Sequence, residues 1–210
     1  MSNETKFWDK IADKYSKQPI ADQAAYEKKL QVTQGYFTPN MEILEFGCGT
    51  GSTAIIHAPY VKHIRAIDIS SEMVKIAQSK ADAQNIKNIT FEQLTIEDLP
   101  VEDSAYDAVL GLSILHLLAD KEAAIAKVYQ MLKPGGIFVS STVCLGDAMS
   151  WFKLIAPIGK ALGFFPLVKV FKVEDLLTSL TEAGFAMDHQ WQPSKDKAIF
   201  IVAKKLNIDT

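Results

Sequence analysis

The stretch Leu44-Glu-Phe-Gly-Cys-Gly-Thr-Gly-Ser52 decides the fold of this chain. Its apolar beginning, within 41–46, predicts a buried strand that stops at three alternating glycines, and the residues at 52–58 predict a helix. Because glycine has no Cβ, the backbone of such a turn can approach a ligand closely. The stretch therefore predicts a strand, a ligand-binding turn and a helix, as at the first crossover of an open α/β sheet.

The rest of the chain alternates short strand patterns with longer helical ones. Two helices are predicted within 1–38. Further helices are predicted after residue 70, after Asp120 and over 174–183. Strands are predicted over 63–67, 88–94, 106–112 and 137–143, and a final hairpin over 186–192 and 198–203. This alternation is typical of an α/β fold with a mostly parallel sheet.

The second strand ends in Asp68, 17 positions after Gly51, where a carboxylate can accept hydrogen bonds from both hydroxyls of a ribose. The spacing Gly47-x-Gly49-x-Gly51 is one residue tighter than the dinucleotide pattern, and Glu45 precedes it. An acid beside the turn repels a pyrophosphate and suits a ligand with an amino group and a cation. The pattern therefore favours S-adenosylmethionine over NAD.

Composition narrows the class of protein. The chain has 210 residues, a net charge of −3, 48% apolar and 22% charged residues, which predicts one globular domain over 1–210. Arg65 is the only arginine among 22 basic residues, so nucleic-acid binding is not expected. The two cysteines, Cys48 and Cys144, form no metal motif, so we expect no bound metal. The N-terminal residues contain no apolar signal sequence, so we expect a cytoplasmic location.

With these motifs in order, the chain resembles the class I S-adenosylmethionine-dependent methyltransferases, and in particular the small-molecule branch that includes quinone-biosynthesis methyltransferases. The resemblance covers nearly the whole chain. It rests on five motifs: 44–52, Asp68-Ile-Ser-Ser-Glu-Met73, Glu97-Asp-Leu-Pro100, Tyr106-Asp-Ala-Val109 and Leu132-Lys-Pro-Gly-Gly136. It implies a Rossmann-like, doubly wound sheet of seven mostly parallel strands with an antiparallel last strand. The implied cofactor is S-adenosylmethionine, with S-adenosylhomocysteine as its product.

The resemblance also implies which residues bind the cofactor. They are Tyr15, Glu45, Gly47, Cys48, Gly49, Gly51, Asp68, Ile69, Met73, Thr95, Ile96, Glu97 and Ser113. Many relatives carry an aspartate where Thr95 stands, so either the Thr95 hydroxyl or the backbone at Ile96 contacts adenine. Glu97 and Asp98 equally fit a solvated turn, and Cys48 is a small spacer rather than a nucleophile.

Two further residues each have two interpretations. Tyr15 either reaches the methionine end of the cofactor, as in relatives, or packs on the helical stripe of Phe7 and Ile11. His116 matches a histidine at the rim of the methyl-donor pocket in this branch, where it would act as the catalytic base, because its ordinary pKa is near neutral. Alternatively, it is a helix-start histidine satisfied by backbone groups.

An insertion at about 145–172 is the clue to the acceptor. Of the 21 residues of Trp151–Phe171, 14 are apolar, yet lysines, prolines and glycines interrupt them, so a membrane span is not expected. The segment fits a helical lid over an apolar acceptor, an ordinary core-covering insertion or a weak membrane-surface contact.

The expected function is therefore methyl transfer to a small, apolar organic acceptor, by a monomer or a homodimer. A catalytically silent cofactor-binding or scaffold protein and an NAD(P)-dependent oxidoreductase stay open as alternatives.

Overall fold

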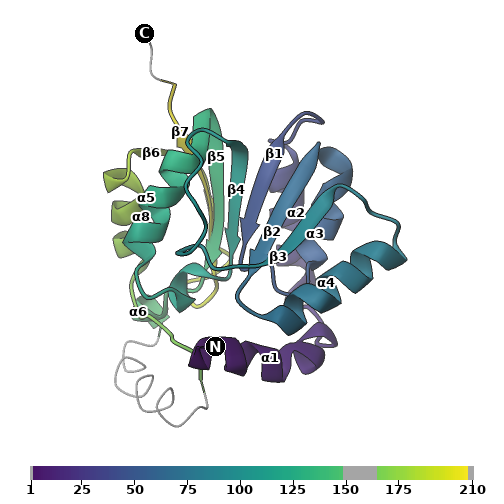
Figure 1. Ribbon diagram of the computed structural model, residues 1–210. Coiled ribbons are helices and arrows are strands. Elements are labelled where there is room, and N and C mark those ends of the chain that lie inside the picture. Colours follow the sequence, from purple (N-terminus) through teal and green to yellow (C-terminus); the bar gives the residue numbers. More distant parts are fainter. Residues whose placement is uncertain (1, 149–164, 208–210) are drawn as a thin grey trace. The chain divides into compact units, whose positions relative to one another are not determined.

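The computed structural model describes residues 2–148 and 165–207 (Figure 1). They divide into two compact units, which we call unit 1 (Met1–Leu99) and unit 2 (Pro100–Thr210). The predicted lid falls mostly outside the described residues. Of it, only the short helix α6 (Leu145–Ala148) and the segment 165–172 are described. None of the helices in the described part of the chain is long and apolar enough to cross a membrane.

Unit 1 is a three-stranded parallel sheet with helices. Its strands are β1 (Glu42–Phe46), β2 (His63–Asp68) and β3 (Ile89–Gln93), in the order β3-β2-β1. Its helices are α1 (Asn3–Ser16), α2 (Gln23–Gln34), α3 (Ser52–His57), the 3-10 turn η1 (Ala58–Tyr60) and α4 (Ser71–Ala83). The middle of β1 is fully buried, as expected for a strand of a parallel sheet.

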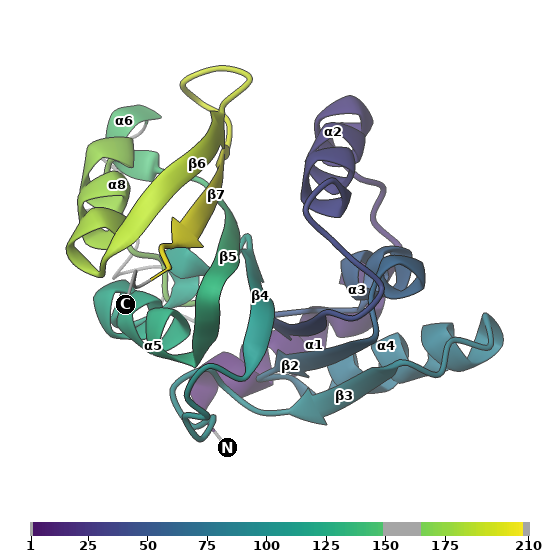
Figure 2. The ribbon, with the colours of Figure 1, turned by 90° about the horizontal axis from the view of Figure 1, so that it is seen from above.

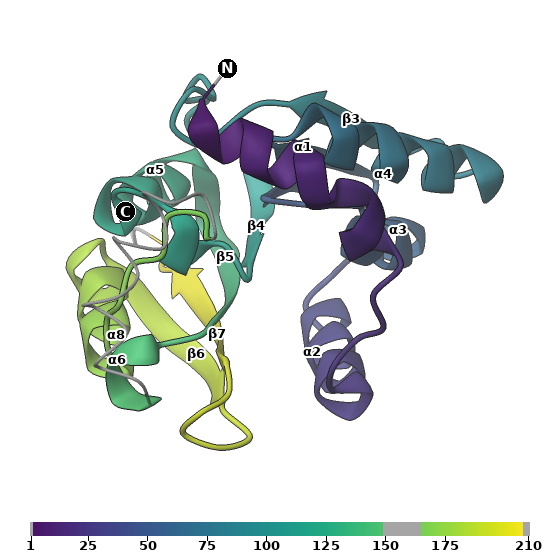
Figure 3. The ribbon, with the colours of Figure 1, turned by 90° about the horizontal axis from the view of Figure 1, so that it is seen from below.

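Helix α4 packs against β2 and β3, and α1 lies alongside α4 (Figure 3). The side chain of Ser70, the residue before α4, accepts a hydrogen bond from the amide of Met73, as the sequence predicts for a helix N-cap. The only arginine, Arg65 of β2, forms two hydrogen bonds of 2.8 and 3.0 Å with Glu92 of β3. Arg65 therefore joins two strands.

In its described residues, unit 2 has four strands and several helices. The strands are β4 (Tyr106–Leu112), β5 (Leu132–Thr142), β6 (Phe185–Trp191) and β7 (Ile199–Lys205), in the order β4-β5-β7-β6. The 3-10 turn η2 (Leu115–Leu117) and the helices α5 (Lys121–Met131) and α8 (Val173–Glu182) accompany α6. Figure 2 shows α5 and α8 side by side along these strands.

The predicted seven strands are all present. β4 and β5 are parallel, whereas β7 is antiparallel to both of its neighbours, so the prediction of a mostly parallel α/β fold with an antiparallel last strand is confirmed. Most strand boundaries differ from the prediction by one or two residues, and that of β5 differs by five. β5 begins at Leu132, because Tyr106 pairs with Leu132 and a register shift then accommodates the turn residues before Ile137.

Candidate cofactor site

The glycine turn of unit 1 has the backbone that the sequence predicts. Gly47, Gly49 and Gly51 all have positive φ angles, of 66°, 54° and 72°, which L side chains rarely adopt. A Cβ on Gly51 would lie 2.7 Å from Cβ of Ala77, so packing also requires glycine there. A Cβ on Gly49 would meet only the ring of Tyr15, at 3.9 Å. Packing therefore leaves room for a side-chain atom at Gly49 but not at Gly51.

Asp68 closes this turn from the end of β2. Its Oδ2 accepts a 2.8 Å hydrogen bond from the Gly49 amide, and its Oδ1 accepts one of 2.9 Å from the Ser70 amide. Burial raises the pKa of Asp68, the two amides lower it, and the charge of Asp9 raises it further. A carboxylate offers about four acceptor positions, so each oxygen retains the capacity to bind a ligand hydroxyl.

Glu45 places a buried carboxyl group beneath the turn. The residue is 3% exposed, and its Oε2 has no hydrogen-bond partner among the described residues. Burial, and then the charge of Asp68, raise its pKa to about 8. Because burial disfavours the ionised form of this carboxyl group, the site fits a ligand whose positive group stabilises the carboxylate. S-adenosylmethionine carries two such groups.

Tyr15 is placed next to the turn by α1. Tyr15 is 45% exposed, and its ring packs edge-on against the Trp8 ring, with the two ring centroids 6.4 Å apart. Burial, followed by the charge of Asp68, raises its pKa. The ring thus lies on the Gly49 side of α1 rather than in the core, which favours the cofactor-contact interpretation.

Tyr26 of α2 is a nearby group that the sequence analysis missed. Its hydroxyl lies 3.2 Å from Oγ1 of Thr53, just after the glycine turn. Burial is the largest cause that raises the pKa of Tyr26. The hydrogen bond with Thr53 lowers this pKa, and the charges of Glu45 and Tyr15 raise it. No local pattern could have indicated this residue, because α2 carries no motif and the contact joins residues 27 positions apart.

The predicted adenine-binding residues lie at two places in unit 1. Met73 is 2% exposed in the core, and Ile69 is half-buried at the start of the α4 connection. Thr95 uses its hydroxyl within its own turn: Oγ1 donates to Oδ2 of Asp98 at 2.8 Å and accepts from the Asp98 amide. Ile96 is buried. Because the Thr95 hydroxyl is already engaged, the Ile96 backbone is the better candidate for an adenine contact.

The surroundings of Glu97 and Cys48 bear on their predicted roles. Glu97 is exposed on the turn, which fits a solvated position as well as a ligand contact. The Cys48 thiol is buried, and its pKa is raised well above its ordinary value by burial and by the nearby carboxylates. A thiol held in its neutral form is a poor nucleophile, in keeping with Cys48 as a spacer.

Ser113 and His116 belong to unit 2. Ser113 adopts a positive φ of 59° directly after β4, and its amide donates to the carbonyl of Ser141 at 2.7 Å. The carbonyl of His116 accepts from the Lys169 amide, whereas its ring Nδ1 is buried with no hydrogen-bond partner among the described residues. Burial lowers the pKa of His116 to about 4. Its imidazole is therefore neutral at physiological pH and able to accept a proton.

The chain is similar to proteins named as methyltransferases. Residues 37–196 match a family model described as a methyltransferase domain. The uncharacterized methyltransferase YcgJ of Bacillus subtilis is 30% identical over 139 residues, which are 66% of this chain and 54% of that protein. Demethylmenaquinone methyltransferase of Symbiobacterium thermophilum is 28% identical over 173 residues, covering 79% of this chain and 65% of that protein. The chain thus spans about half to two thirds of these relatives.

Solved structures show the same fold. The crystal structure of YcgJ has a TM-score of 0.72 at 18% identity and covers 86% of this chain and 99% of that one. An S-adenosylmethionine-dependent methyltransferase from Mesorhizobium loti has a TM-score of 0.70 at 22% identity, with 87% and 99% covered. At these identities the likeness establishes the Rossmann-like fold.

Proposed function

The chain belongs to the methyltransferase domain family, whose methyl donor is S-adenosylmethionine, and from this premise we propose that it transfers a methyl group from S-adenosylmethionine to a small, apolar organic acceptor. The observation that carries the proposal is the arrangement of three features of unit 1. These are the glycine backbone at Gly49, the carboxylate of Asp68 that accepts its hydrogen bond, and the buried carboxyl group of Glu45, whose Oε2 has no hydrogen-bond partner among the described residues.

Each of these features has a separate role in binding. Asp68 accepts hydrogen bonds from the ribose hydroxyls while the amides of Gly49 and Ser70 fix its orientation. Glu45 provides the negative charge that a cationic ligand neutralises. Tyr15 covers the glycine turn from α1, and the chain at Ile96 and Met73 supplies the apolar surface for adenine.

When bound, S-adenosylmethionine supplies an activated methyl group on a sulfonium. The protein's task is then to exclude water and to align the acceptor, since proximity and orientation account for much of the rate enhancement in such transfers. His116 is the proposed base, which takes a proton at its ring nitrogen from an acceptor hydroxyl or acidic carbon. The ring is neutral at physiological pH, so one nitrogen has a lone pair for that proton, although the lowered pKa makes it a weaker base than an ordinary histidine.

The acceptor class rests on sequence and on one relative's name. The apolar stretch within Trp151–Phe171 favours an apolar acceptor, and the relative from Symbiobacterium is named for a quinone. We also propose that the protein is a cytoplasmic enzyme that acts as a monomer or homodimer. An NAD(P)-dependent reaction is disfavoured, because a pyrophosphate, unlike a cation, cannot stabilise the ionised form of the buried Glu45.

The test is a transfer assay with an unbiased acceptor. The chain is incubated with methyl-labelled S-adenosylmethionine and a cell extract, and the labelled products are identified by mass spectrometry. The proposal expects one labelled small molecule that is lost with a His116→Asn variant. Binding of the cofactor without any labelled product would instead favour a silent cofactor-binding protein.

A further inference from the structure

A hydrogen-bond network joins the N-terminal helix α1 to the glycine turn. Oδ1 of Asp9, on α1, accepts a hydrogen bond of 2.6 Å from the hydroxyl of Ser70 and one of 3.2 Å from the amide of Glu72. Both donors lie at the start of α4, 61 and 63 positions further along the chain. Asp9 therefore attaches α1 to the N-terminus of α4, where a negative charge is also favourable.

Ser70 connects Asp9 to the carboxylate of Asp68, which is the proposed ligand-binding group. The residue is 0% exposed, and its hydroxyl donates to Asp9 while it accepts from the amide of Met73. Its own amide donates to Oδ1 of Asp68, whose Oδ2 accepts from the amide of Gly49. A continuous set of hydrogen bonds thus runs from Asp9 to the open glycine of the turn.

The same helix carries Tyr15. Asp9 and Tyr15 are six residues apart on α1, a separation of about 9 Å along a helix axis. The Tyr15 ring lies beside Gly49 and packs against Trp8, the neighbour of Asp9. Fixing α1 at Asp9 therefore fixes the side chain that covers the turn, although Asp9 itself is attached to α4.

We propose that Asp9 is a positioning residue: through Ser70 it holds α1, with Tyr15, over the cofactor-binding turn and so slows the release of S-adenosylmethionine. This inference rests on the proposed function of the turn. In this proposal, α1 covers the bound cofactor. Asp9, which lies outside the motifs named above, controls how long the cofactor stays bound.

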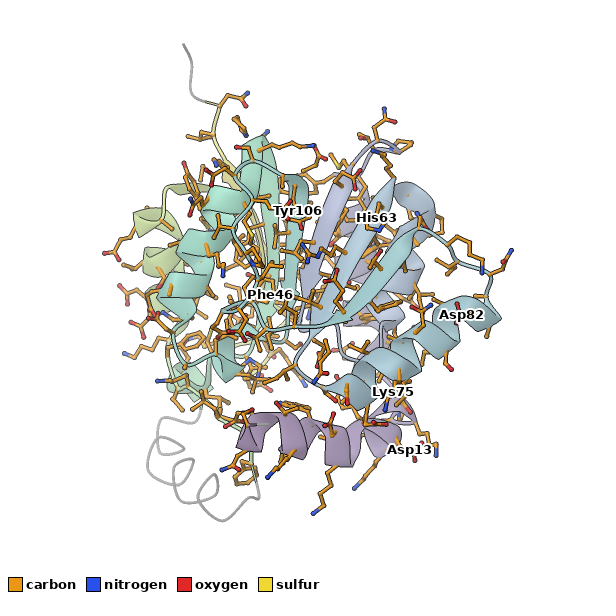
Figure 4. All side chains as sticks on the ribbon, in the orientation of Figure 1. Asp13, Phe46, His63, Lys75, Asp82 and Tyr106 are labelled. Atoms are coloured by element: carbon orange, nitrogen blue, oxygen red, sulfur yellow. The ribbon has the colours of Figure 1, made fainter. Side chains whose placement is uncertain are left out.

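The variant set separates hydrogen bonding from charge. Asp9→Ala removes the acceptor, whereas Asp9→Asn removes the charge and keeps an acceptor oxygen for Ser70 and Glu72. Asp13→Ala is the matched control, because Asp13 lies one turn further along α1, its side chain is 79% exposed, and its carboxylate pairs with Lys17 of the same helix. Figure 4 shows Asp13 on the outer side of α1.

The experiment measures the dissociation rate of S-adenosylmethionine from the full-length chain by stopped-flow displacement, with thermal unfolding recorded for every variant. We expect Asp9→Ala to raise the dissociation rate at least tenfold, and Asp9→Asn and Asp13→Ala to stay within about twofold of the wild type. The KM for S-adenosylmethionine should rise more than kcat falls. Equal rates for Asp9→Ala and Asp13→Ala would overturn the inference, as would equal effects of Ala and Asn at position 9.

A double variant covers the case in which Asp9→Ala is poorly folded. In a Ser70→Ala background the Asp9→Ala change should add little to the dissociation rate, because the shared hydrogen bond is already lost. Fully additive effects would contradict the proposed route through Ser70. A wild-type chain that binds no S-adenosylmethionine would instead refute the proposed function, so the two failures are distinguishable.

Discussion

The amide of Gly49 donates a 2.8 Å hydrogen bond to Oδ2 of Asp68, so the acid at the end of β2 directly holds the glycine turn that follows β1. Two strands that are neighbours in unit 1 thereby present one preformed surface, a backbone without a side chain next to a buried carboxylate. A ligand that uses both needs no rearrangement of either, which lowers the entropic cost of binding.

Replacing Asp68 tests this arrangement. We expect Asp68→Ala to weaken S-adenosylmethionine binding at least tenfold, or about 1.4 kcal/mol, because the ribose loses a charged acceptor and the turn loses its anchor. Isothermal titration calorimetry measures the change, with Asp82→Ala on the exposed side of α4 as the control. An unchanged affinity would remove Asp68 from the site.

Two of the three glycines of the turn, Gly49 and Gly51, should respond differently to alanine. Gly49→Ala adds a Cβ that makes only an ordinary contact with the Tyr15 ring and costs about 1–2 kcal/mol of left-handed strain, so it should mainly weaken cofactor binding. Gly51→Ala adds a clash with Ala77 and with the ring of Phe91, so it should lower the free energy of unfolding further. Urea denaturation measures both variants. Equal losses of stability would contradict the packing account of Gly51.

Glu45 should make the stability of the ligand-free protein depend on pH. Its pKa rises from an ordinary 4.5 to about 8 on folding, so the folded state retains a proton that the unfolded chain releases. The stabilisation is fully present below about pH 4.5 and is lost as pH rises to about 8. Glu45→Gln keeps a neutral side chain, so it should gain stability relative to the wild type across this range. A difference that is constant with pH would contradict the assignment.

Cofactor binding should also release a proton from Glu45. A cationic ligand favours the carboxylate, so at neutral pH on the order of one proton leaves per molecule bound, and affinity rises with pH up to about 8. Calorimetry in buffers of different ionisation enthalpy counts the proton. The Glu45→Gln variant should show no release, and a wild type without release would argue against a cation at Glu45.

His116→Asn should separate catalysis from cofactor binding. We expect a fall in kcat of about 10²–10⁴-fold with an unchanged affinity for S-adenosylmethionine, which is the usual range for losing a general base. Because the pKa of His116 is lowered to about 4, the wild-type rate should show no histidine titration near neutral pH. An activity unaffected by the substitution would assign the base to another group or to solvent.

The parts of the site that the sequence predicted are those encoded locally. Gly47, Gly49 and Gly51 need positive φ angles that almost only glycine adopts, and Asp68 ends a strand whose length is visible in its apolar residues. The same holds for the Ser70 and Asp120 helix caps, whose side chains accept hydrogen bonds from amides three residues away.

The parts that the sequence missed depend on polar contacts between distant segments. Asp9 with Ser70 and Tyr26 with Thr53 join residues 61 and 27 positions apart, and no periodicity marks them. At Thr95 the structure favours one of two alternatives that the sequence leaves open, because the hydroxyl forms a hydrogen bond within its own turn. The β5 boundary differed because pairing with Tyr106 extends the strand across residues that usually break one.

The most direct test of the central claim is an equilibrium titration of the wild-type chain with S-adenosylmethionine and, in parallel, with NADH. The account predicts saturable binding of one S-adenosylmethionine per chain and no comparable binding of NADH, because a cation stabilises the ionised form of the buried Glu45 and a pyrophosphate does not. Tight binding of NADH without binding of S-adenosylmethionine would contradict it.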